Sequence, residues 1–213
     1  MSLAGYNTKI KITGTATAMS SQAMSIHSTV ANTFRINSTA RRVWSRTGTL
    51  TFRQNSGTTS VSTISNTDIS DVDYLFGIVT FNTIKAGTVS VSGNYLPLSN
   101  IAGSNTYGLN ITRVLQEDTD HTSTGWISRQ NSLFDVSLSV GRFDNVDKDF
   151  FSLINSGNAA VVEVNPGGTT LAARGFFLVE SENRSGDVAS LEGSDLSFQL
   201  DGDVNASFSF NTP

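Results

Sequence analysis

The chain has no cysteine and only three prolines among its 213 residues. Without cysteine it has neither a disulfide framework nor thiolate chemistry. Charged residues make up only 15% of the sequence, whereas Ser, Thr, Asn and Gly occur throughout. No apolar run is long enough to span a membrane, and the first residues, MSLAGYNTKIKI, lack the apolar core of a signal peptide. We therefore expect a soluble protein, made in a cytoplasm, with many strands joined by Gly and Asn turns.

Acidic residues are missing from the first part of the chain. Seven basic residues and no acidic one precede Asp68, and seven basic and eighteen acidic residues follow from Asp68 on. The two parts carry formal charges of +7 and −11, in keeping with the net charge of −4. This asymmetry indicates a surface that meets opposite charge, on nucleic acid or on another copy of the protein. The alternative is a basic edge packed beside acidic strands within one subunit, since segments interleave in β folds.

Tyr74–Leu96 is the stretch around which the predicted fold is organised. Tyr74–Phe81 is an almost unbroken apolar run, which predicts a strand covered on both faces. Thr88–Leu96 alternates instead and predicts a strand with one wet face. The polar positions of that strand are Ser90, Ser92 and Asn94. The intervening NTIKAG predicts a hairpin loop between the two strands.

Further strands follow from alternation elsewhere. Leu133–Phe143 is the most amphipathic segment, and its polar positions are Asp135, Ser137 and Ser139. Gly14–Met24 has no strong period and is predicted to be a loop or an arm. Asp201-Gly202 predicts a hairpin turn, and so does Asn165–Gly168.

The period changes to a helical one only in Asp144–Gly157. Acidic residues crowd its start and Gly157 stands where a C-terminal cap belongs. The sequence therefore predicts an all-β fold, a mostly antiparallel sandwich or barrel, with one short packed α-helix near residues 145–156. With no linker and no fixed repeat, residues 1–213 are expected to form one domain.

Asn37–Gly48 interrupts the strand pattern and is predicted to be a flexible, exposed loop. It holds Arg41, Arg42 and Arg46 around Trp44. Basic residues interleaved with an aromatic one are typical of nucleic-acid contacts, and equally of a hot spot between proteins.

Histidine and acidic residues offer little for metal chemistry. His121 follows Asp118 and Asp120 in one polar loop, whereas catalytic zinc draws its ligands from more than one element. The D-x-D-x-N run at 201–205 begins like a calcium loop but lacks the later Gly and Glu. We expect no metal and no cofactor.

No catalytic motif is present either. The chain has no G-x-S-x-G, no phosphate-binding glycine loop and no histidine in a triad context. Glu180 and Glu182 lie two apart on one strand face, a pattern more typical of a solvated stripe than of a glycosidase pair. The protein is not expected to be an enzyme.

Several segments, in their order along the chain, carry a family resemblance. They are YLFGIVTF and AGTVSVSGNYLPL after an Asp-rich approach, then Tyr107–Leu115, DTDHTSTGW, SLFDVSLSVGRF, DKDFFSLINSG and the closing FFLVESENRSGDVASLEGSDLSFQLDG. From Ser2 on, most of the chain resembles the tail tube (major tail) proteins of long-tailed bacteriophages.

The resemblance implies a structural virion protein that assembles, in the bacterial host cytoplasm, into stacked hexameric rings forming the hollow phage tail. Its partners would be further copies of itself and other tail proteins, with no membrane, and genomic DNA would pass through the lumen without specific binding. The early loop would reach the next ring through Arg41, Arg42, Trp44 and Arg46. The two polar strand faces are the expected lumen lining, Ser90, Ser92 and Asn94 on one and Asp135, Ser137 and Ser139 on the other. The alternative is a β-sandwich module that binds carbohydrate or a receptor, which would need an exposed aromatic platform.

Overall fold

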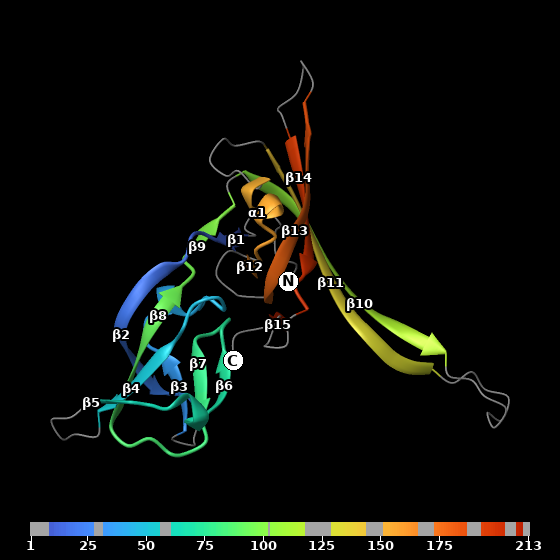
Figure 1. The fold of residues 1–213 in the computed structure, drawn as a ribbon. Helices are drawn as coiled ribbons and strands as arrows, with labels where there is room; N and C mark the ends of the chain where they lie inside the picture. Colours follow the sequence, from blue (N-terminus) through green and yellow to red (C-terminus); the bar gives the residue numbers. More distant parts are fainter. Residues whose placement is uncertain are drawn as a thin grey trace, which may run out of the picture. The chain divides into compact units, whose positions relative to one another are not determined.

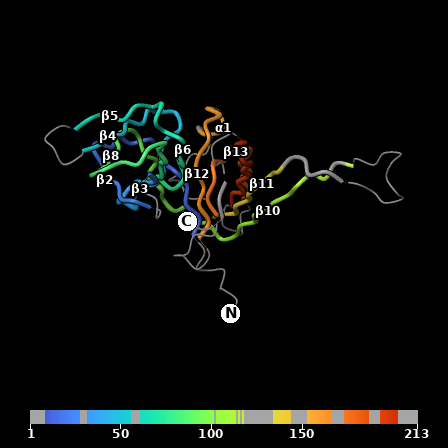
Figure 2. Tube along the Cα trace, turned by 90° about the horizontal axis from the view of Figure 1, so that it is seen from below, coloured from blue at the N-terminus to red at the C-terminus, as the bar shows by residue number. Residues whose placement is uncertain are grey.

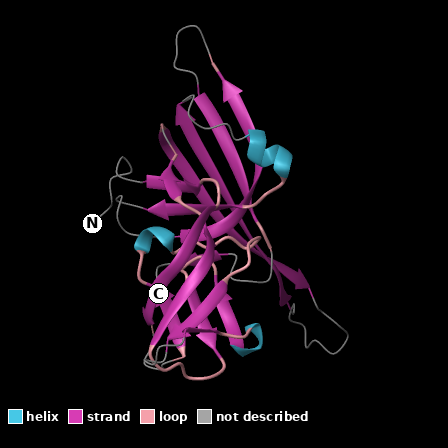
Figure 3. Cartoon of the chain, turned by 60° about the vertical axis from the view of Figure 1, so that its left-hand side comes forward, coloured by secondary structure: helices cyan, strands magenta, loops and turns pink. Residues whose placement is uncertain are grey.

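The computed structural model describes residues 9–27, 32–55, 61–101, 103–117, 129–143, 151–165, 173–186, 193–202 and 208–210. Strands dominate these residues (Figures 1 and 3), and the helices are short: α1 (Phe151–Ser156) and the 3₁₀ helices η2 (Thr39–Arg41) and η3 (Asn66–Asp68). The strands are β1 (Lys9–Thr13), β2 (Thr17–Ile26), β3 (Thr33–Ile36), β4 (Thr51–Asn55), β5 (Val61–Thr63), β6 (Ile69–Asp73), β7 (Ile78–Phe81), β8 (Thr88–Tyr95), β9 (Leu98–Asn100), β10 (Ser104–Glu117), β11 (Arg129–Phe143), β12 (Ala160–Asn165), β13 (Ala173–Ser185), β14 (Gly193–Leu200) and β15 (Phe208–Phe210). The predicted fold class, mostly antiparallel β with one short α-helix, is confirmed.

The chain divides into two compact units. Unit 1 comprises Met1–Ile101, Ala160–Phe176 and Gly202–Pro213, and unit 2 comprises Ala102–Ala159 and Phe177–Asp201. Strand β13 therefore contributes its beginning to unit 1 and the rest to unit 2. That residues 1–213 form one domain stays a prediction.

Unit 1 contains a sheet of seven strands in the order β5-β4-β8-β2-β3-β7-β6. Alternation explains its inner face: Val89 and Val91 of β8 are buried, while Ser90 and Ser92 are half-buried on the other face. Aromatic rings fill the core behind it, with the Phe52 centroid 5.9 Å from Trp44 and 5.8 Å from Phe81.

The other strands of unit 1 run in the order β9-β1-β12 and continue to the start of β13, which also pairs with β15. In β1, KIKIT, Ile10 and Ile12 are buried. All six residues of β12 are buried, as expected for a strand covered on both faces, and they include the carboxylate of Glu163.

Unit 2 is built from β10, β11, β14 and the remainder of β13, each antiparallel to its neighbour. Helix α1 belongs to this unit, and its Leu153 and Ile154 are half-buried. Gly157 ends the helix with φ +63°, and its N–H donates to the Leu153 carbonyl, as predicted for a C-terminal cap. Residues 144–150, where the helix was predicted to begin, lie outside the described residues.

The predicted hairpin within Tyr74–Leu96 is wrong. β7 begins only at Ile78, because residues 74–77 form a turn in which Asp73 Oδ1 accepts from the N–H groups of Leu75 and Phe76. Gly77 completes the turn with φ +64°. β7 pairs with β3 and β6, whereas β8 pairs with β2 and β4, so two strands separate them. Residues 82–87 are a connection between non-adjacent strands.

Two further expectations are corrected. Gly14–Met24, predicted to be a loop, contains most of β2, whose alternation is hidden by a bulge between Met19 and Gln22 where Ser21 has φ +46°. The hairpin predicted at Asp201-Gly202 is absent from the described pairings, because β14 and β15 both pair with β13, along successive segments of it. The predicted β12 and β13 neighbours are confirmed.

Candidate assembly surface and polar sheet face

The hairpin of β10 and β11 extends beyond the rest of the sheet in unit 2. β11 pairs with β14 only from Ser137 to Phe143, whereas Arg129–Val136 pairs with β10 alone among the described strands. At about 3.3 Å per residue, this two-stranded part is roughly 25 Å long. Figure 2 shows the two strands side by side out to the end of the described segment. We call Ile111–Glu117 together with Arg129–Val136 the arm.

One face of the arm carries exposed apolar side chains. Ile111 is 38% exposed, Leu115 55% and Phe134 47%. Ile111 is opposite Val136, which is fully buried, so the apolar face of the sheet continues onto the arm. On the arm the side chains of this face become exposed to solvent. The guanidinium of Arg113, opposite Phe134, lies 5.9 Å from the centroid of that ring. An isolated two-stranded hairpin is marginally stable in water, and this one also exposes apolar surface.

The opposite face of the same sheet is polar, as predicted for β11. Asp135 and Ser137 are half-buried and Ser139 is exposed. The pairing adds residues that the sequence pattern alone did not identify, namely Gly108, Asn110 and Thr112 of β10 and Asp195, Ser197 and Gln199 of β14. Gln199 Nε2 donates to Asp135 Oδ1 at 2.5 Å. The described side chains that β10, β11 and β14 place on this face include two carboxylates, Asp135 and Asp195, and no Lys or Arg.

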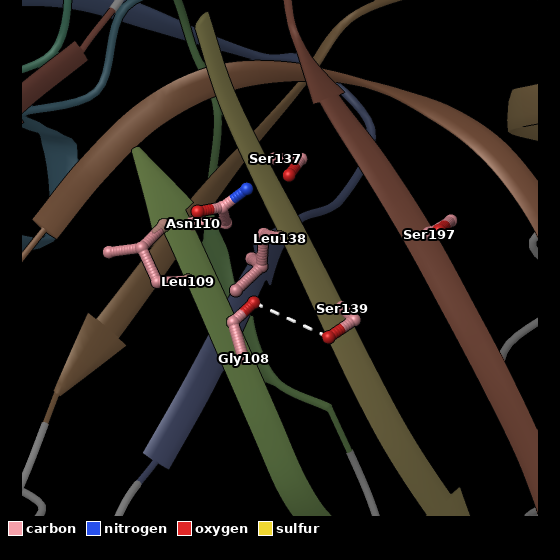
Figure 4. Close-up of a pocket in the computed structure, with 7 residues that line it drawn as sticks. All are labelled: Gly108, Leu109, Asn110, Ser137, Leu138, Ser139 and Ser197. Carbon is pink, nitrogen blue, oxygen red and sulfur yellow. Dashed lines mark hydrogen bonds between the residues drawn. The ribbon is translucent and has the colours of Figure 1, made fainter. Parts of the chain in front are cut away.

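A shallow hollow of about 210 Å³ lies on this polar face. Figure 4 shows its lining, which consists of Gly108, Leu109, Asn110, Ser137, Leu138, Ser139 and Ser197. Ser139 Oγ donates to the Gly108 carbonyl at 3.4 Å. A Cβ at Gly108 would lie 2.9 Å from that hydroxyl, so a larger residue at this position would displace the Ser139 side chain. The hollow offers hydroxyl and amide groups but no cluster of ionisable groups.

The second predicted lumen face, on β8, is in unit 1. Ser90, Ser92 and Asn94 are half-buried. Ser92 Oγ accepts from the backbone N–H of Ser21 at 2.9 Å. Ser90 is opposite the exposed Arg53 of β4, so this face, unlike that of β11, has a cation in its register.

The segment 37–48 contains the clearest correction among the predicted site residues. Trp44 was expected at the surface, but its exposed fraction is 0%. Its backbone N–H donates to the Tyr74 carbonyl at 2.8 Å and it forms an isolated bridge with Tyr95. Distant backbone carbonyls thus order this segment, which its own composition did not indicate. Trp44 is therefore unavailable as an anchor between copies or as an aromatic platform for carbohydrate.

The three arginines of this segment have different surroundings. The Arg41 guanidinium lies 5.6 Å from the Tyr95 ring centroid, and that of Arg46 lies 4.0 Å from the Phe176 ring. Arg42 is half-buried, and its buried Nε has no hydrogen-bond partner among the described residues. That this segment contacts another copy stays a prediction.

The most buried carboxylate among the described residues is a structural one in unit 1. Glu163 accepts from Lys11 Nζ at 2.6 Å, from Asn165 Nδ2 at 2.6 Å and from Arg174 Nε at 2.9 Å. Arg174 Nη1 also donates to the Leu75 carbonyl at 2.7 Å. Burial would raise the pKa of the Glu163 carboxyl, but the hydrogen bonds and charges of its partners hold that pKa below its ordinary value. The network ties β1, β12 and β13 to the turn at residues 74–77.

Other candidate groups also have structural partners or lie outside the described residues. Glu182 forms an ion pair with Arg142 at 2.9 Å, whereas Glu180 is exposed beside a bulge in β13. No group of three metal-ligating side chains occurs among the described residues, and the 118–121 loop lies outside them. Within the described part of the chain, no helix has the length and hydropathy needed to cross a membrane.

Comparisons with known proteins give a likeness in structure only. No protein-family model matches the chain, and no curated protein matches it. Among solved structures, the chain is similar to one described as "Virion of native gene transfer agent (GTA) particle", with a TM-score of 0.46 and 18% identity over 54% of this chain and 89% of the other. It is also similar to one described as "Tail of empty GTA particle computed with helical refinement, C6 symmetry", with a TM-score of 0.46 and 17% identity over 55% of this chain and 87% of the other.

Proposed function

We propose that this chain is a structural protein of a phage tail, which assembles into stacked hexameric rings that form a hollow tube for DNA. The arm carries this proposal. The tail-tube resemblance of the sequence, from Tyr74 to the closing strands, gives it a family context.

A free subunit with this arm leaves two sources of binding energy unused. The apolar face at Ile111, Leu115 and Phe134 is in water, and β10 is a long edge strand whose outer backbone groups lack a strand partner among the described residues. Edge strands of this kind are templates for pairing with another chain. A closed ring satisfies them without open-ended aggregation. Other copies of the chain are therefore the proposed occupants of the arm.

The polar face of β10, β11 and β14 is the better of the two candidate lumen linings. Its described charges are the carboxylates Asp135 and Asp195, which repel phosphate. The β8 face has Arg53 beside Ser90, and a cation would retain the DNA backbone through counterion release. The proposed role needs DNA to slide past without specific binding.

The remaining parts of the proposal follow from this role. The protein would be no enzyme and would need no metal or cofactor. It would assemble in the host cytoplasm with other tail proteins and would be found in the tail of the virion, without contact to a membrane.

The test is assembly of the purified protein, followed by electron microscopy and sedimentation. Wild-type protein should form rings or tubes. Phe134→Ser should keep the circular dichroism spectrum of the subunit but prevent assembly, because it removes apolar surface from the arm alone. Ile84→Ser is the matched control, since Ile84 is 71% exposed and lies in unit 1. A wild-type subunit that stays monomeric at high concentration would refute the proposal, and so would normal assembly of the Phe134 variant.

A further inference from the structure

Arg42 occupies an unusual position in unit 1. It follows η2 and its main chain packs tightly on the turn at residues 74–77: a Cβ on Gly77 would lie 2.8 Å from the Arg42 carbonyl oxygen. This tight packing fixes the position of the Arg42 main chain. Its Nε is buried, and no hydrogen-bond acceptor for it lies within the described part of the chain. A buried donor without a partner is unfavourable by an amount comparable to a lost hydrogen bond.

The charges near Arg42 also disfavour its positive charge. Burial lowers the pKa of Arg42, and so do the neighbouring positive charges of Arg35 and Arg174. Burial, Arg35 and Arg42 together lower the pKa of His27, which the carboxylate of Asp73 partly offsets. His27 directly follows β2 and Arg42 directly follows η2, while the other groups lie on β3, on β13 and at the end of β6, so the site is assembled from five parts of unit 1.

The nearby carboxylates are already engaged. Glu163 accepts from Lys11, Asn165 and Arg174. Asp73 accepts from the N–H groups of Leu75 and Phe76, and its burial raises its pKa, which disfavours the anion. Both carboxylates therefore already have other partners, and the buried Nε of Arg42 has no hydrogen-bond acceptor in the described chain.

The arm offers an anion of the required kind. It ends at Glu117, which is exposed. On the proposed function, the arm already meets another copy through its apolar face. We propose that Arg42 is the centre of a carboxylate-binding site that receives Glu117, at the end of the arm of a second copy. A guanidinium fork binds a carboxylate in a bidentate way, which fixes register as well as affinity.

The test compares Arg42→Gln with Arg53→Gln, a matched loss of one positive charge from an exposed position on β4. Arg42→Gln should raise the concentration needed for assembly about tenfold or more, as expected for losing one charged interfacial pair. Arg53→Gln should leave that concentration unchanged. The free Arg42→Gln subunit should melt at the same temperature as wild type or higher, because the substitution removes a like charge from beside Arg35 and Arg174. Arg42→Glu combined with Glu117→Lys should recover part of the assembly that either change alone abolishes.

The outcomes separate the two proposals. Normal assembly of Arg42→Gln beside normal wild-type tubes would overturn the Arg42 site and leave the proposed function standing. A lowered melting temperature of the free Arg42→Gln subunit would assign Arg42 a structural role and also overturn the inference. Unchanged assembly with weaker retention of the variant on single- and double-stranded DNA at low salt would identify phosphate as the ligand instead. Failure of the wild type itself to assemble would overturn both proposals.

Discussion

Replacing Glu163 with Gln is the sharpest test of how unit 1 is held together. The Glu163 residue is 3% exposed and its two oxygens accept from Lys11, Asn165 and Arg174. Glutamine keeps the shape of the side chain but removes its charge and replaces one acceptor with a donor. Arg174, itself buried, then loses its counter-charge.

Breaking a buried ion pair by removing one partner destabilises a protein by about 3–5 kcal/mol. In a chain of this length each kcal/mol lowers the melting temperature by about 2–4 °C, so the expected loss is roughly 6–20 °C. Glu180→Gln is the control, because Glu180 is an exposed carboxylate on β13. Its effect should stay within about 0.5 kcal/mol.

The assay is urea and thermal unfolding followed by tryptophan fluorescence. The sequence has two tryptophans, so a Trp126→Phe background leaves Trp44, in the core of unit 1, as the only one. The pKa of Glu163 is lowered in the folded state, so its contribution is present above its unfolded pKa of about 4.5 and is lost as the pH falls through the folded pKa. The gap between wild type and Glu163→Gln should therefore narrow below about pH 4.5. Equal effects of the two substitutions at pH 7, or a gap independent of pH, would refute the reasoning.

Four further substitutions test other parts of unit 1 and the helix cap of unit 2. Trp44→Ala should destabilise the subunit by about 3–5 kcal/mol in urea melts, because it leaves a cavity at a fully buried site. Unchanged stability would contradict the burial of Trp44. Gly77→Ala should destabilise by about 1–3 kcal/mol, and by more than Gly157→Ala, because both glycines have positive φ but only Gly77 would gain a clashing Cβ. Asp73→Asn should stabilise the subunit at pH 7: burial raises the pKa of Asp73, so its ionisation opposes folding as the pH rises through the folded pKa. That gain should shrink as the pH is lowered toward 3.8, and its absence at pH 7 would show that the carboxylate is stabilised in the fold.

The local sequence pattern was sufficient to predict the structure where burial of one face alone determines it. The alternation of Ile10 and Ile12 agrees with the burial of one face of β1, and Gly157 marks the end of α1, where its φ is +63°. The polar face of β11 could likewise be predicted from the alternation of polar and apolar residues along the strand. Alternation reports which face of a strand is covered, and that property is local.

Which strands pair with one another could not be predicted from the local sequence pattern. Tyr74–Phe81 and Thr88–Leu96 are close in sequence and were joined as a hairpin, but β2 and β3 lie between the strands that form there. The apolar run was also split, because Asp73 captures two N–H groups and starts a turn. Trp44 was placed at the surface for a related reason: the carbonyl of Tyr74 that fixes it is distant in sequence.

The charged residues that make the sequence uneven in charge fall into two groups. Lys11 pairs with Glu163 within unit 1, and Lys85 pairs with Asp68, so basic and acidic segments do interleave inside one subunit. Such pairs cannot drive association, because their charges are already satisfied. Arg42 differs, since its burial and its neighbours make it unfavourable as an isolated cation. Salt should therefore weaken assembly mainly through Arg42, and the salt dependence of assembly should flatten in the Arg42→Gln variant but persist in Arg53→Gln.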